Sequence, residues 1–192
     1  MALALEPARL ATSAVLADVH YQDATAPVTL GRTLLDQYRA DGAGSRHIPI
    51  FLMVGATSST GDALGPFVGW FLKRKHFAGV VMGDLEGPVH ATNIEEKVHE
   101  IRQLGQQYNR IPYVVAVDAA VGRSGHITVN SGPLRPGAGM GKTLPEVGNV
   151  HVMGGTASFP FLIWFAGLDQ TVAMAEVIAD GILSFCTRLG TP

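Results

Sequence analysis

The sequence predicts an α/β fold of three layers, with a mainly parallel sheet between two layers of helices. Short runs rich in β-branched and aromatic residues, at 48–54, 79–82 and 113–117, each lead into a polar loop, as buried parallel strands do. Segments with apolar residues at helical spacing follow these loops. The chain has 192 residues, 47% of them hydrophobic and 23 of them glycine, which suits a sizeable core with many tight turns.

The elements are expected in the following order. Residues 1–45 form an N-terminal extension, loosely ordered to about residue 27, and a helix at 29–39 that packs on the core. Residues 46–192 form a single α/β/α domain. Its expected elements are a strand at 48–54, a helix opening after Thr60, a strand at 79–82, a helix at 93–108, strands at 113–117, 126–130 and 150–153, and helical segments ending near residue 189.

The sequence GATSSTGDALGP at residues 55–66 connects the first of these strands to a helix. In such a unit the loop lies at the carboxyl edge of a parallel sheet, where ligands bind. Thr60 can cap the helix, and Asp62 then lies where the helix dipole favours a negative charge. Asp62 is therefore either a site residue or simply a carboxylate at a helix N-terminus.

A second aspartate, Asp118, ends the apolar run at 113–117. Because the carboxyl ends of parallel strands share one edge, Asp62 and Asp118 are expected to face one crevice. The alternative for Asp118 is an Asx turn, which is common after a strand. As close neighbours the two carboxyl groups would not both ionise easily, so one would act as a base and the other as an acid with a raised pKa.

Composition excludes several classes. The formal charge is −2 with Lys and Arg scattered, so no nucleic-acid partner is expected. Cys186 is the single cysteine and is expected to pack in the core. No secretory signal is evident, which favours a cytoplasmic protein. The longest apolar run, 159–168, is too short to span a membrane and is expected to be a buried helix start or a contact in a homo-oligomer.

The glycine-rich segment at 131–148 is expected to be a mobile flap over the crevice, with Lys142 making an electrostatic contact. Its GKT sequence at 141–143 matches the end of a phosphate-binding loop. However, Pro136 stands where that motif needs a glycine, and a proline follows where a helix should open.

Five motifs together resemble the YyaC-type family of proposed spore proteases. They are STGDALGP at 59–66, PVHATN at 88–93, VDA at 117–119, PGAGMGK at 136–142 and LPEVG at 144–148. Some of them also resemble the germination protease of spore formers and the hydrogenase-maturation endopeptidases.

The resemblance implies a phosphorylase/hydrolase-like fold and a peptidase that uses Asp62 and Asp118 as catalytic residues. It implies a protein or peptide substrate and a place in the mother cell or forespore of a spore-forming bacterium. No cofactor is expected, although the likeness to the maturation enzymes allows a metal ion at the two aspartates. The family's charged pair is absent from residues 55–58, which leaves a catalytically inactive, peptide-binding protein as the alternative.

Further residues are expected to bind substrate at this edge of the sheet. They are Ser58, Ser59, Thr60, Gly61, Glu86, His90 and Lys142. For Glu86 and His90 the alternative is a hydrogen bond that only stabilises their loop. The loop at 57–61 also leaves open a phosphate-binding protein, because it precedes a helix N-terminus.

Overall fold

The computed structural model describes residues 13–136 and 144–190. Its six-stranded sheet has the strand order β1-β5-β6-β4-β2-β3. The strands are β1 (Val15–His20), β2 (His47–Met53), β3 (Val80–Met82), β4 (Ile111–Val121), β5 (His126–Ser131) and β6 (Val150–Ala157). The helices are α1 (Ala26–Ala40), α2 (Leu64–Arg74), α3 (Ile94–Tyr108) and α4 (Leu168–Leu189), with a 3-10 helix η2 (Pro160–Phe165) before α4.

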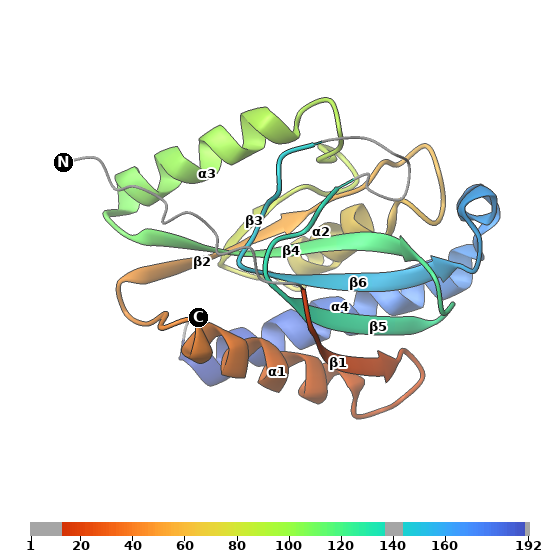
Figure 1. Cartoon of the computed structure of the whole chain (residues 1–192), viewed down its shortest axis with the longest axis horizontal. Helices are drawn as coiled ribbons and strands as arrows, with labels where there is room; N and C mark the ends of the chain where they lie inside the picture. Colours follow the sequence, from red (N-terminus) through yellow and green to blue (C-terminus); the bar gives the residue numbers. More distant parts are fainter. Residues whose placement is uncertain (1–12, 137–143, 191–192) are drawn as a thin grey trace.

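The sheet is mainly parallel and lies between two helical layers, as the sequence predicted. Strand β2 pairs in parallel with β3 and with β4, and β4 pairs in parallel with β6. Only β5 runs against its neighbours β1 and β6. Helix α3 covers one face, and α1, α2 and α4 cover the other (Figure 1).

Two cores fill the spaces between the layers. The larger core joins α1, α2 and α4 to the sheet through large side chains such as Leu34, Phe51 and Phe185. The smaller core lies under α3, where Ile94 and Ile101 are buried as the helical spacing predicted. Both cores are built from alternate residues of the same strands, because successive side chains of a strand point to opposite faces.

The N-terminal region differs from its prediction. Residues expected to be loosely ordered form β1, which pairs with β5 at the edge of the sheet, and α1 begins at Ala26. In β1 only Ala17 and Val19 pack against the core. A short edge strand buries one side of its pleat, so its apolar signal is weak. The division of the chain at residue 45 stays a prediction.

The ends of several other elements also differ. Strand β4 continues to Val121, so Asp118 lies inside the strand and not after its end. Helix α2 has Ala63 at its N-cap, so Thr60 does not cap it. Strand β6 extends to Ala157. All three differences lie at the carboxyl edge of the sheet. There the two strands, and the loop before α2, are longer than apolar periodicity indicated.

The apolar run at 159–168 is not a buried helix start. It forms η2 and its flanks, and all but one of its large apolar side chains are exposed: Phe159, Phe161, Leu162, Trp164, Phe165 and Leu168. Pro160 is in the first turn of η2, where its missing backbone N–H costs no intrahelical hydrogen bond. A role as a contact in a homo-oligomer stays a prediction. In the described part of the chain no helix is both long and apolar enough to cross a membrane.

Candidate functional site

The loop after β2 is held in shape by backbone and carboxylate contacts. Gly55 has φ +146, and a Cβ atom there would lie 2.0 Å from the Asp62 carbonyl oxygen, so only glycine fits. The Ala56 N–H donates to Asp62 Oδ2 at 3.0 Å. This bond closes the loop from residue 56 to residue 62 and fixes the Asp62 carboxylate at the carboxyl end of β2.

Asp118 occupies the neighbouring strand β4, between β2 and β6. Its neighbours Val117 and Ala119 pack toward α1, α2 and α4, so alternation directs Asp118 to the α3 side of the sheet. The residue is half-buried. The Ala119 N–H donates to Asp118 Oδ1 at 2.8 Å.

The environment of Asp118 favours a protonated carboxyl group. Burial, followed by the negative charge of Asp62, raises the pKa of Asp118 from 3.8 to about 8, against the opposing effect of the Ala119 N–H. The two aspartates therefore interact electrostatically at one edge of the sheet. At neutral pH Asp118 keeps its proton, which makes the carboxyl group a hydrogen-bond donor beside a second carboxyl group. The direction of this shift agrees with the sequence-based expectation.

The other residues predicted on this loop lie in different environments. Ser59 is buried, and its hydroxyl donates to the Ile163 carbonyl oxygen at 3.2 Å. The Gly61 N–H donates to the same oxygen at 3.1 Å. Ser58 is exposed and Thr60 is half-buried. The loop is thus attached to η2, a contact that sequence reasoning missed.

The loop after β3 lies beside this one, because the Gly55 N–H donates to the Val89 carbonyl oxygen at 2.8 Å. His90 on that loop is half-buried, and its Nδ1 lies 2.9 Å from Thr92 Oγ1. Glu86 is exposed. The predicted contact residue Lys142 lies outside the described residues.

Asp84 is a buried carboxylate that the sequence analysis did not single out. It pairs with Lys73 and accepts N–H groups from Glu86 at 2.7 Å and Gly87 at 2.8 Å. Burial alone would raise its pKa, but Lys73 and the two N–H groups outweigh burial and lower the pKa. Asp84 thus stays ionised and shapes the turn that leads to His90.

The flap predicted at 131–148 is described only at its two ends. Leu134 and Val147 pair there and are buried against Val114 and Ala116. Both ends therefore lie on the α3 side of the sheet, the side to which Asp118 is directed. The expected mobility of this segment stays a prediction.

The metal ion that the resemblance allows at Asp62 and Asp118 stays a prediction. The described residues form no group of three or more His, Cys, Asp or Glu side chains that could hold a metal ion.

Comparison with known proteins identifies the family. The family described as "Protein of unknown function (DUF1256)" matches residues 18–181, which include every described candidate residue. The chain belongs to this family. It is also 38% identical over 173 residues to the uncharacterized protein YyaC of Bacillus subtilis (strain 168), a match that covers 85% of this chain and 80% of that protein. The YyaC-type resemblance is thereby confirmed, and the match spans both aspartates.

Proposed function

We propose that this protein is a peptidase in which Asp62 and Asp118 are the catalytic pair. The observation that supports the proposal is the raised pKa of Asp118, to about 8, caused by burial and by the negative charge of Asp62. Two carboxyl groups whose environments separate their pKa values are suited to act as a base and an acid. Their position at the carboxyl edge of a parallel sheet is where such folds bind ligands.

The proposed chemistry needs only these two groups and water. The ionised Asp62 accepts a proton from water as the water oxygen attacks the peptide carbonyl carbon. Asp118 donates its proton to the nitrogen of the leaving amine as the carbon–nitrogen bond breaks. The proton held by Asp62 then returns to Asp118 through solvent, which restores both groups.

The setting we propose is the cytoplasm of the mother cell or forespore in a spore-forming bacterium. Two points support it: the resemblance of the sequence motifs to those of proposed spore proteases, and a relative from Bacillus subtilis. The proposed substrate is a protein or peptide that lies across the loops following β2 and β3. The exposed side chains around η2 are consistent with a homo-oligomer.

The test is cleavage of a peptide library prepared from a bacterial proteome, followed by mass spectrometry. Wild type is compared with Asp62→Asn, Asp118→Asn and the control Asp36→Asn, an exposed position on α1. We expect about a hundredfold slower cleavage in the first two variants and no change in the control, because general acid and base catalysis contribute on that order. Equal cleavage by all four proteins, or none by wild type, would overturn the proposal.

A second candidate is a peptide-binding protein without catalysis. It is favoured because each aspartate already accepts a backbone N–H of its own loop or strand. In addition, two cavities formed by described residues have linings that include neither aspartate. Peptide binding that persists without cleavage, with affinity unchanged in Asp118→Asn, would favour this candidate.

A further inference from the structure

A cavity with a volume of about 250 Å³ lies at the amino edge of the sheet. Strands β2 and β4 begin at this edge and α3 ends there, at the left of Figure 1. The described lining residues are Arg46, Asn109, Arg110 and Ile111. From Ile111 to Asp118 the strand β4 extends over about 20 Å, so the cavity is separate from the pair of aspartates.

The backbone holds Arg46 and Arg110 side by side. Arg46 directly precedes β2, and Arg110 directly precedes β4. The first residues of these strands, His47 and Ile111, are partners in the parallel register, and the Ile111 N–H donates to the Arg46 carbonyl oxygen at 2.9 Å. Neighbouring strands lie about 4.8 Å apart. Two positively charged side chains therefore leave adjacent strand starts and line the same cavity.

No described carboxylate neutralises this pair of charges. Neither Arg46 nor Arg110 forms an ion pair or a side-chain hydrogen bond with a described residue. Asp41, on the loop that leads to β2, accepts the Tyr113 hydroxyl at 2.8 Å and Gln37 Nε2 at 2.7 Å. Both of its carboxylate oxygens thus already have donors. Like charges on adjacent strands repel each other, so an anion between them would be favourable.

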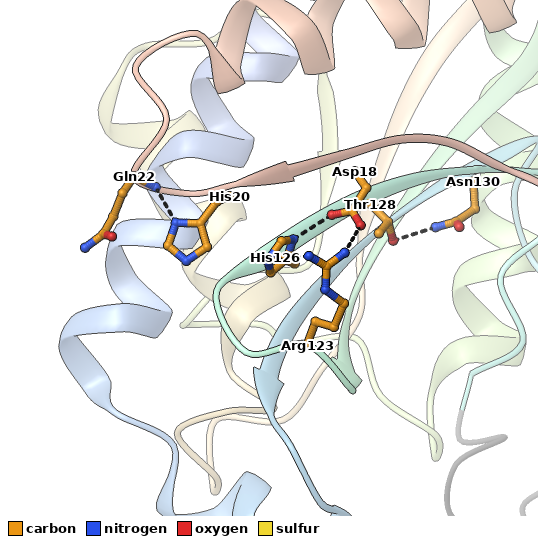
Figure 2. A network of polar contacts seen from close by, with 7 residues as sticks. All are labelled: Asp18, His20, Gln22, Arg123, His126, Thr128 and Asn130. Carbon is orange, nitrogen blue, oxygen red and sulfur yellow. Dashed lines mark hydrogen bonds and ion pairs between the residues drawn. The ribbon is translucent and has the colours of Figure 1, made fainter.

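Two other exposed arginines of the chain do have a carboxylate partner. Arg123 lies against Asp18 and His126, on β1 and β5, as Figure 2 shows. Arg135 pairs with Glu146. In each case a carboxylate accepts guanidinium N–H groups and offsets the positive charge. At the amino edge both guanidinium groups remain available to an anion that enters the cavity from solution.

The end of α3 contributes an amide group to the lining. Asn109 lies in the left-handed region with φ 51, a conformation that asparagine adopts more readily than most residues. The carboxyl end of a helix carries about half a negative charge, which disfavours an anion. Two full positive charges outweigh it, and carbonyl groups of the last turn already accept the N–H groups of Asn109 and Arg110.

These donors match a phosphate group better than a carboxylate. A guanidinium group is planar and donates two parallel N–H groups to one anion. A carboxylate has two oxygens, which one arginine engages fully, whereas a phosphate group has further oxygens for the second arginine. The cavity is smaller than the roughly 300 to 1,000 Å³ of pockets for drug-sized ligands, and Ile111 gives it one apolar wall. A phosphate group with a short carbon chain suits these dimensions.

We propose that this cavity binds a small phosphate monoester, with its phosphate group between Arg46 and Arg110. Both guanidinium groups donate to phosphate oxygens, and the side-chain amide of Asn109 donates a further hydrogen bond. Ile111 contacts the organic part. This site goes beyond the proposed peptidase activity and does not depend on it, because the two sites lie at opposite edges of the sheet.

The test is isothermal titration calorimetry of the whole chain at about pH 7.5, where a phosphate monoester is mainly a dianion. The probes are glycerol 3-phosphate, inorganic phosphate and succinate, a dianion without a phosphate group. Sodium chloride keeps the ionic strength constant, because salt screens exposed charges. Wild type is compared with Arg46→Gln and Arg110→Gln, which remove one charge each.

The matched control is Arg102→Gln, at an exposed position on α3 outside the described lining. Urea unfolding checks that all three glutamine variants fold. Asp118→Asn is titrated as well and should bind glycerol 3-phosphate as wild type does. That measurement separates this site from the proposed catalytic pair.

We expect glycerol 3-phosphate to bind wild type at least as tightly as inorganic phosphate, and succinate to bind about tenfold more weakly. Each of Arg46→Gln and Arg110→Gln should weaken binding of glycerol 3-phosphate by about tenfold or more, as the loss of a charge-assisted hydrogen bond would. The control Arg102→Gln should leave it unchanged.

Four results would overturn the proposal. The first is the absence of phosphate binding by wild type. The second is binding that survives both substitutions or falls equally in the control, because the anion then lies elsewhere or responds only to net charge. The third is succinate binding as tight as phosphate binding. The fourth is glycerol 3-phosphate binding that is weaker than that of inorganic phosphate, which would exclude a monoester.

Discussion

Replacing Asp118 with asparagine should stabilise the protein as the pH rises. With the pKa raised to about 8, the folded protein keeps a proton that the unfolded chain releases above its ordinary pKa of 3.8. Stability is therefore fully present below about pH 4 and is lost as the pH rises toward about 8. Asparagine cannot ionise, and its side-chain oxygen can still accept the Ala119 N–H.

The size of the effect follows from the shift. Each pH unit between the two pKa values is equivalent to about 1.4 kcal/mol, so at about pH 7 wild type has lost about 4 kcal/mol relative to Asp118→Asn. The assay is urea unfolding of both proteins, with Asp36→Asn as the control, at several values from about pH 5 to about pH 7. We expect the stability difference to widen steadily over this range. A difference that stays constant would refute the reasoning, because Asp118 would then ionise normally in the folded protein.

Three further predictions concern neighbouring contacts. Asp62→Asn removes the charge that opposes ionisation of Asp118, so a carboxyl carbon NMR titration should show a lower Asp118 pKa; an unchanged pKa would contradict the coupling. Asp84→Asn removes the charge from a buried carboxylate that accepts two backbone N–H groups and pairs with the exposed Lys73, and should lower the unfolding free energy by about 2 kcal/mol at neutral pH in urea unfolding. Gly69→Ala places a Cβ atom 2.0 Å from the Gly83 carbonyl oxygen and should lower the melting temperature by several degrees; an unchanged value would refute the close packing.

The central strands and α3 could be predicted from the sequence because their signals are strong and local. Strands β2 and β4 are buried on both faces and appear as nearly continuous apolar runs. Helix α3 has one buried face with regular spacing, and Asn93 directly precedes it at the N-cap. In each case one chain segment contains most of the information that determines its structure.

Strand β1 and the site geometry could not be predicted in the same way because they depend on partners distant in sequence. β1 forms a strand by pairing with β5, and the pattern of its own six residues does not by itself predict a strand. Ser59 and Gly61 contact Ile163, and Thr156 lies close to Gly61. Each contact joins segments about a hundred residues apart in the sequence.

The pair of aspartates could be proposed because both follow apolar runs, yet the position of Asp118 inside β4 was missed. Apolar periodicity ends at Val117, whereas backbone pairing with β6 continues to Val121. Hydrogen bonding between strands does not depend on side-chain polarity, so pairing continues beyond the apolar run. The exposure of η2 was missed for a related reason, because a dense apolar run does not distinguish a core from a surface.

The pairing of β1 with β5 has a consequence for synthesis of the chain on the ribosome. Asp18 and His126, which contact each other across these strands, are separated by 108 residues. Helix α1 also depends on a late segment, since Gly31 packs against Ser184 in α4. Of the described elements, the two that are synthesised earliest thus depend on segments synthesised much later. Strand β1 cannot complete its pairing before β5 has emerged, nor α1 its packing before α4, and until then their apolar faces are open to chaperones.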